Sequence, residues 1–433
     1  MLEKIDRFYG IKKGGSSFKV EILAGLTTFL TASYIIFVNP SILSQTGMDK
    51  SALITVTCLA AFFGTALFAL WPKVPLMMAP GMGLNAFFAY TLVIGNKVDW
   101  RTGLGVVFLS GALFLILSIA GLRQKILKAI PNELRLATSI GIGLFITFIG
   151  LQNLGIIVHS ETTLVKLGTM TVPALLGLAG VLVITILIHK KVNGSILIGI
   201  LATTMLGILF SHVTPPKAVL SMPPSPMPLM FELNIIGALK FSLAGLIFAF
   251  MYVDFFDTLG TILAVSGRAG LVNKDGSIPK IGSMLMSDAL ATIGGAVFGT
   301  SPTTTYIESA SGIAQGGRTG LTALVVAILF LLSPIFAPII SIVPAFATAP
   351  ALIVVGVFMM REIKGIDFED FSKAIPIFLT IVIMPLTYSI ANGIMFGFIS
   401  WVLIKIILGK WKDLNVILIS IALLSFINLL VSF

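Results

Sequence analysis

Four acids stand in otherwise apolar stretches of the chain, and they have the clearest capacity for chemistry. They are Asp254, Asp257, Asp288 and Glu308. A charged group at the centre of a bilayer costs about 2.5–3.5 kcal/mol on insertion scales. An acid at that depth is therefore a candidate functional residue. Such a carboxylate can accept hydrogen bonds from a polar ligand or carry a proton. The alternative for each acid is a structural hydrogen-bond partner for a neighbouring helix.

The acids differ in their predicted surroundings. Asp254 and Asp257 are three residues apart, which predicts that they share one helix face. Asp288 is expected near a helix end, where a structural role explains it best. Glu308 lies in segment 299–313, GTSPTTTYIESASGI, between two long apolar runs.

A second interrupted segment, 78–90, contains Asn85 within APGMGLNAFFAY. Like 299–313, it is too short and too polar to span lipid alone. Irregular backbone is tolerated at membrane depth where protein or a water-filled cavity satisfies its polar groups. We therefore expect two half-helices whose N-termini meet near the membrane centre and whose free amides face a shared cavity.

The composition is that of an integral membrane protein. Of the 433 residues, 57% are hydrophobic and 11% are charged, against about 25% charged in a typical soluble domain. Cys58 is the single cysteine, and His159, His189 and His212 have no acid at metal-ligand spacing, so neither a metal nor a cofactor is expected. The net charge of +10 is attributed to basic cytoplasmic loops rather than to nucleic-acid binding.

Apolar stretches of roughly 20 residues predict fourteen transmembrane segments with a cytoplasmic N-terminus. Residues 22–43 align with 242–263, since both begin with LAGL and end with IL, and a broken segment follows at a similar distance in each half. Because seven segments per half is an odd number, the second half starts on the opposite side of the membrane and is inverted relative to the first. Inverted repeats with interrupted segments at matching positions are typical of transporters.

Several motifs resemble those of one family. PGMGLNAFFAY, DFFDTLGT, and GTSPTTTYIESASGI followed by GGRTGLTA are similar to motifs of the AzgA-like purine permeases, a branch of the nucleobase:cation symporters related to the uracil and xanthine permeases. The resemblance covers essentially the whole chain. It implies an all-α membrane protein of fourteen segments in a 7+7 inverted repeat, with a core domain, a gate domain and short β-like stretches ahead of the half-helices.

The implied organisation divides the chain into seven parts. They are a cytoplasmic tail (1–21), the first half of the core (22–125), the first half of the gate (126–212), an extracellular connector (213–235), the second half of the core (236–340), the second half of the gate (341–410) and an apolar C-terminal segment (411–433). Residues 414–433 go beyond the fourteen-segment plan, as either an additional span or an interfacial helix. The resemblance also implies a homodimer in the plasma membrane.

The resemblance further assigns roles to residues of the two broken segments and of the DFFDTLGT helix. Glu308 and Asp254 bind the nucleobase, Asn85 and Asp257 support binding or transport, and backbone amides near Ala86 and Tyr306 contact the ring. Asp257, Asp254 and Asp288 are the candidates for proton coupling or its support.

The chemistry of the residues agrees with a purine ligand. Hypoxanthine and guanine offer N1–H as a donor, guanine adds an amine, and a carboxylate accepts both. The acceptors O6 and N7 suit free amides. Acids that share an apolar cavity repel one another, so at least one should hold a proton near neutral pH. The sequence therefore predicts proton-coupled uptake of guanine or hypoxanthine by an elevator mechanism, with adenine as the alternative substrate.

Two other classes fit less well. An intramembrane aspartyl protease also uses two embedded aspartates, but it requires a GxGD motif, which the sequence lacks, and about nine helices. An anion permease of the same fold would place its substrate beside Glu308 and Asp254, which repel a bare anion. We therefore expect a transporter and not an enzyme.

Overall fold

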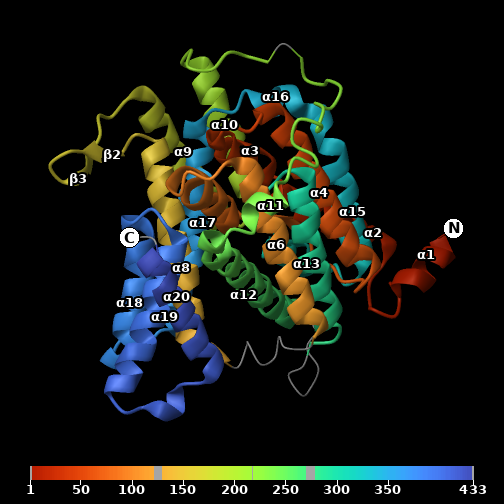
Figure 1. Cartoon of the computed structure of the whole chain (residues 1–433). Coiled ribbons are helices and arrows are strands. Elements are labelled where there is room, and N and C mark those ends of the chain that lie inside the picture. Colours follow the sequence, from red (N-terminus) through yellow and green to blue (C-terminus); the bar gives the residue numbers. More distant parts are fainter. Residues whose placement is uncertain (1, 121–128, 217, 270–277, 432–433) are drawn as a thin grey trace.

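The computed structural model describes residues 2–120, 129–216, 218–269 and 278–431 of the 433-residue chain. These residues form a helical bundle with two small two-stranded sheets (Figure 1). The elements of the first half are α1 (Leu2–Tyr9), α2 (Phe18–Ala32), α3 (Ile35–Leu43), α4 (Lys50–Leu70), β1 (Met78–Pro80), α5 (Met82–Ala86), the π-helix Phe87–Gly95, α6 (Trp100–Ile119), α8 (Asn132–Asn153), β2 (Ile157–Ser160), β3 (Leu164–Leu167), α9 (Val172–His189) and α10 (Ser195–Leu209).

The second half has a similar alternation of long helices and one broken segment. Its elements are α11 (Ile235–Ala238), α12 (Ala244–Ala269), α13 (Ile281–Phe298), β4 (Thr303–Thr305), α14 (Ser309–Ala314), α15 (Gly320–Leu332), α16 (Ala337–Ser341), α17 (Ala345–Met360), α18 (Phe371–Leu386), α19 (Ile390–Ile407) and α20 (Val416–Val431). Short 3₁₀ turns occupy Ser44–Thr46, Phe241–Leu243, Ser333–Phe336, Arg361–Gly365 and Trp411–Asp413.

Ten helical stretches within the described ranges are long and apolar enough to cross a membrane, and four shorter apolar helices accompany them. A bilayer core about 30 Å thick requires roughly 20 apolar residues per helix, which these stretches supply. The fourteen-segment inverted repeat stays a prediction. So does its division into domains, whose boundary between 125 and 126 lies outside the described residues.

The long helices pack into two sets that lie side by side in Figure 1. In one set α8 packs against α17 and α18, and α19 against α18. In the other set α4 packs against α15 and α13, and α6 against α13. The long helix α12 and the broken segment with α14 belong to this second set, since α12 packs against α6, α13 and α14, and α12 also touches α8 and α19 of the first set. The apolar C-terminal segment forms α20, which packs along α19.

The two broken segments pair with each other through β1 and β4. The strands are antiparallel, with Met78 opposite Thr305, Ala79 opposite Thr304 and Pro80 opposite Thr303. Both strands are fully buried. Each is only three residues long, and the strands come from opposite halves of the chain. The β-like stretches implied by the resemblance are thereby confirmed, and the pair joins the halves at the centre of the bundle.

Glu21 is a buried carboxylate that the sequence placed in the polar tail. It lies in the first turn of α2 with no exposed surface. Its oxygens accept hydrogen bonds from the amides of Arg318 (3.0 Å), Thr319 (3.3 Å) and Thr322 (3.2 Å), at the start of α15. The first amides of a helix have no partner within it, and a carboxylate there also interacts favourably with the helix dipole. Glu21 therefore caps a helix of the other half.

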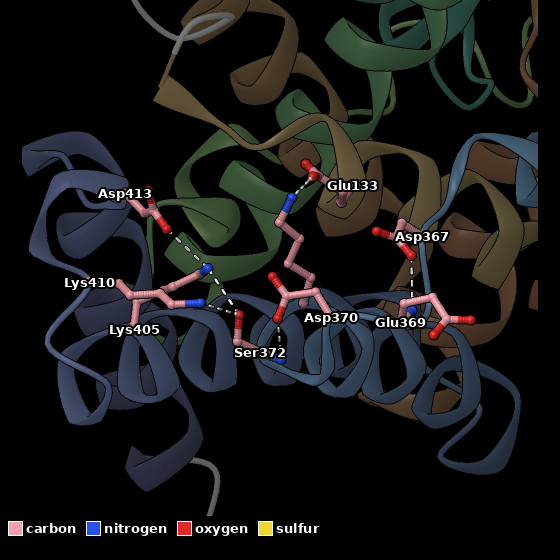
Figure 2. A network of polar contacts seen from close by, with 9 residues as sticks. Glu133, Asp367, Glu369, Asp370, Ser372, Lys405, Lys410 and Asp413 are labelled. Carbon is pink, nitrogen blue, oxygen red and sulfur yellow. Dashed lines mark hydrogen bonds and ion pairs between the residues drawn. The ribbon is translucent and has the colours of Figure 1, made fainter.

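A polar network closes one end of α18 and α19 (Figure 2). Lys405, which is 1% exposed, donates to Ser372 Oγ (3.1 Å) and forms an ion pair with Asp413 Oδ2 (3.1 Å). Nearby, Lys373 pairs with Glu133 Oε1 of α8 at 2.8 Å. A buried lysine is stable when it is paired and hydrogen-bonded. The network therefore fixes the ends of α8, α18 and α19 relative to the turn that leads into α20.

Candidate functional site

A cavity of ≈ 490 Å³ lies between the two sets of helices. Its wall is formed by the broken segments 81–83 and 304–308 together with parts of α8, α12 and α17. Pockets of about 300–1,000 Å³ are typical of sites for small organic ligands. Several residues of its lining are exposed, so the cavity is open to the surface. Asn132 and Glu362 are two of them, at the start of α8 and just after α17.

Glu308 lines this cavity just ahead of α14. The hydroxyl of Tyr34, between α2 and α3, donates to Glu308 Oε1 at 2.6 Å. Tyr34 is 2% exposed and lines the same cavity, so it holds the carboxylate in place. No other residue of the described chain donates a hydrogen bond to Glu308 Oε2, so this oxygen can accept from a ligand.

Asp257 of α12 is a second acid in the cavity lining, besides Glu308. It is exposed to the cavity, and the hydroxyl of Thr304 lies 3.4 Å from its Oδ2. Thr304 belongs to β4, so the strand pair also orients a polar side chain toward the cavity.

Asp254 and Asp288 do not line the cavity. Asp254 is 1% exposed and accepts from Thr292 Oγ1 of α13 at 2.7 Å. Asp288 is fully buried and accepts from Thr258 Oγ1 of α12 at 2.7 Å. Asp254 Oδ1 and Asp288 Oδ2 have no partner within the described chain. Two buried carboxylates therefore lie at the contact of α12 with α13.

The positions of these two acids correct two predictions. Asp254 and Asp257 do not point the same way, because residues three apart on an α-helix diverge by roughly 60°. One faces α13 and the other faces the cavity. Asp288 does not lie near a helix end, since it is about two turns into α13.

Asn85 and Ala86 also lie outside the cavity wall. Asn85 Oδ1 accepts from the Ser301 hydroxyl, while its Nδ2 is buried without a partner in the described structure. Ala86 is 1% exposed and is the last residue of α5. Asn85 therefore ties the two broken segments together behind the wall.

The half-helix termini differ from the prediction as well. The amide of Tyr306 donates to Met77 O at 3.0 Å and is not free for a ligand, although Tyr306 lines the cavity. The amides that begin α14 are also used, since those of Ser309, Ala310 and Ser311 bond to the carbonyls of residues 306–308. These four amides are therefore not available to a ligand. The amides of Ile307 and Glu308, just ahead of α14, have no backbone acceptor among the described residues, so free amides at this half-helix stay a prediction for those two.

At α5 the amides of the first turn have no side-chain acceptor. Its N-cap residue, Gly81, supplies no side-chain cap. Gly81, Met82 and Gly83 line the cavity, and the first helical bond in this turn runs from Asn85 N to Gly81 O. The amides of Met82 and Gly83 precede that bond, so they are backbone donors that the site can offer.

Sequence reasoning missed Tyr34 and Thr304. Tyr34 sits in an apolar run where a tyrosine reads as a packing residue, and Thr304 is one of three consecutive threonines. One signal in the sequence could have identified Tyr34. A hydroxyl within a transmembrane segment needs a hydrogen-bond partner, and Glu308 was already a candidate site residue.

Comparison with known proteins agrees with this architecture. The Permease family model (Xan_ur_permease) matches residues 19–396. The chain belongs to this permease family. It is a membrane transport protein, and the ten apolar helices of the described ranges are long enough for a multi-pass arrangement.

Relatives extend over nearly the full chain. The guanine/hypoxanthine permease PbuG of Bacillus subtilis is 42% identical over 95% of this chain and 96% of its own. The guanine/hypoxanthine permease PbuO of the same organism is 41% identical over 98% of this chain and 100% of its own. The adenine permease AdeQ of Escherichia coli is 40% identical over 97% of this chain and 95% of its own.

Solved structures identify the fold. The transmembrane domain of the cyanobacterial bicarbonate transporter BicA superposes with a TM-score of 0.67 at 17% identity, covering 86% of this chain and 97% of that domain. Murine Slc26a9, an anion transporter in the inward-facing state, gives 0.63 at 10% identity over 90% of this chain and 69% of its own. At these identities the likeness concerns the fold alone.

Proposed function

We propose that this permease carries hypoxanthine and guanine into the cell across the plasma membrane together with protons. The observation that carries the proposal is Glu308, which lines a cavity of suitable volume and whose Oε2 accepts no hydrogen bond from another described residue. The N1–H of an oxo-purine, and the amine of guanine, are the donors that such a carboxylate accepts. Two relatives named guanine/hypoxanthine permeases support the assignment.

The remaining polar groups of the cavity complement the same ligand. Asp257 offers a second acceptor, with Thr304 beside it. The amides of Met82 and Gly83 offer donors to a ring nitrogen or to O6. Asn85 and Tyr306 support the site through hydrogen bonds that join the broken segments presenting these groups, and Ala86 follows Asn85 in α5.

We further propose that the structure is inward-facing. The cavity reaches the surface beside Asn132 and Glu362. The turn that contains Glu362 also carries Arg361 and Lys364, and basic turns lie on the cytoplasmic side. The N-terminus is cytoplasmic in this orientation. Sliding of the helix set that holds Glu308 and Asp257 against the set of α8, α17, α18 and α19 would expose the cavity to the other side.

Asp254 and Asp288 are the proposed carriers of the coupling proton. They are buried on neighbouring helices, and each keeps one oxygen without a partner in the described structure. Two isolated carboxylates in an apolar interior are costly when both are charged, so one proton between them lowers that cost. Protonation there would act on the site through α12, which carries Asp254 and Asp257.

Uptake by cells tests the proposed substrate and ion. Cells that lack their own purine permeases would express the protein and receive labelled hypoxanthine, guanine, adenine or uracil. We expect uptake of hypoxanthine and guanine well above uracil, collapse of uptake with a protonophore, and no loss when sodium is replaced by choline. Uracil uptake equal to that of hypoxanthine would refute the substrate assignment, and a sodium requirement at constant pH would refute the coupling ion.

Asp254→Asn tests the proton carrier. Asn has the shape of a protonated aspartate but cannot release a proton, so net uptake should be lost while exchange of internal for external hypoxanthine continues. The measurement compares net uptake with exchange in proteoliposomes at two external pH values. Equal loss of both processes, at normal protein level, would show that Asp254 is a structural or binding residue. Asp288→Asn, measured in parallel, shows whether the proton is shared.

Adenine is the second candidate substrate, because an adenine permease relative is about as similar to this chain as the guanine/hypoxanthine permeases are. Adenine presents N1 as an acceptor, so it would bind a protonated Glu308 or Asp257. The homodimer implied by the resemblance stays a prediction, which the mass of the purified protein in detergent would test.

A further inference from the structure

Arg135 is the one cation in the described lining of the cavity. It lies in the first turn of α8, near the mouth, and the acids of the same lining are Asp257, Glu308 and Glu362. Arg135 belongs to the helix set opposite the one that carries Asp257 and Glu308. A ligand between the two sets would therefore meet acids on one side and a guanidinium on the other.

The guanidinium of Arg135 has no hydrogen-bond or ion-pair partner among the described residues. Its Nε is buried and has no hydrogen-bond partner within the described residues, and no acid of that part of the chain lies within 4.0 Å as an ion-pair partner. Its central carbon lies 5.4 Å from the centre of the Phe256 ring, which also lines the cavity. A buried polar group without a partner is costly, and a ligand that supplies the missing acceptor removes that cost.

The shape of the guanidinium selects the kind of acceptor. Its donors form a rigid planar fork that matches two adjacent acceptors at once. In nucleic-acid recognition the same fork binds the O6 and N7 atoms of guanine. Hypoxanthine presents the same O6 and N7 pair, whereas adenine has an amino group in place of O6, and its hydrogens face the fork.

We infer that Arg135 binds the O6/N7 edge of an oxo-purine in the mouth of the cavity and thereby selects oxo-purines over adenine. The inference rests on the proposed function and names a specificity residue for it. The N1–H edge of the base remains available to Glu308. Because Arg135 and Glu308 lie on opposite helix sets, the contact with Arg135 forms when the cavity is open at this mouth.

Equilibrium binding of labelled hypoxanthine and adenine to the purified full-length protein tests the inference. Arg135→Ala should weaken hypoxanthine binding about tenfold and change adenine binding less than about twofold, since only the oxo-purine loses a bidentate contact. Arg135→Lys should restore part of the affinity at most, because a point charge cannot bond both acceptors in one plane. The matched control is Arg361→Ala, which removes an arginine stacked 4.8 Å from the Phe358 ring near the same mouth but outside the lining.

The outcomes separate this inference from the proposed function. Wild-type affinity for hypoxanthine in Arg135→Ala, or equal weakening of both bases, overturns the role of Arg135 and leaves purine transport intact. The control variant should match the wild type, and a tenfold loss there would also overturn the role by showing a general effect of charge. A wild-type protein that binds neither base refutes the proposed function, and one that binds adenine alone overturns the oxo-purine assignment.

Discussion

Glu308→Gln should weaken hypoxanthine and guanine binding by roughly ten- to more than a hundredfold while the protein still reaches the membrane. The substitution keeps the size of the side chain and an oxygen for the Tyr34 hydroxyl. It replaces the free acceptor with an amide that donates toward the donors of the base. Loss of a charge-assisted hydrogen bond is worth about 1.5–3 kcal/mol, which corresponds to this range of affinity. Equilibrium binding to purified protein measures it, with surface level as the control for insertion.

Tyr34→Phe is the matched variant for Glu308. It removes the hydroxyl that donates to Glu308 Oε1 at 2.6 Å but leaves the carboxylate in the cavity. We expect a smaller loss of affinity, about five- to tenfold, because the carboxylate stays charged but is less well held. If Glu308→Gln binds purine as the wild type does, Glu308 is a structural support for the broken segment and the site lies elsewhere.

Glu21→Ala should lower the stability of the folded protein more than any single change in the cavity. It leaves the amides of Arg318, Thr319 and Thr322 inside the protein without their acceptor. Each buried donor left without a partner costs roughly 1–3 kcal/mol, so the sum is about 3 kcal/mol or more. The expected result is a lower melting temperature in detergent and less protein in the membrane. Thermal unfolding followed by size-exclusion chromatography measures both.

Two variants give the comparison for Glu21. Glu21→Gln keeps one acceptor oxygen and should fall between the wild type and Glu21→Ala. Glu3→Ala removes an exposed acid from α1 in the same tail and should leave the melting temperature unchanged. A wild-type melting temperature in Glu21→Ala would show that solvent replaces the carboxylate and that the start of α15 is less enclosed than its burial indicates.

The broken segments and the importance of the acids were predictable from the sequence, because interrupted and charged stretches stand out in an apolar chain. Which acids face the ligand was not predictable. Asp254 and Asp257 differ by a small rotation about α12, and the packing of α13 decides which of them is enclosed. Periodicity indicates a face of a helix but not the neighbour that covers it.

The expectation of β-like stretches at β1 and β4 came from the resemblance and not from a pattern in the residues. Strands of three residues have no alternation to detect, and their partners lie in opposite halves of the chain. Glu21 was missed for a related reason. It precedes the first apolar run and reads as part of a solvated tail until the start of α15 covers it. Both features depend on contacts between distant segments, which a local reading of the sequence does not contain.

These contacts between distant segments can form only late in the synthesis of the protein. The hydroxyl of Tyr306 bonds to Pro80 O across 226 residues, and the Arg318 amide bonds to Glu21 across 297. A ribosome that adds about 5–20 residues per second makes Tyr306 and Arg318 roughly 10–60 s after it has made Pro80 and Glu21. During that interval β1 has no strand to pair with and Glu21 has no helix to cap. The nascent first half must therefore wait, with polar backbone shielded by the insertion machinery, until its complement enters the membrane.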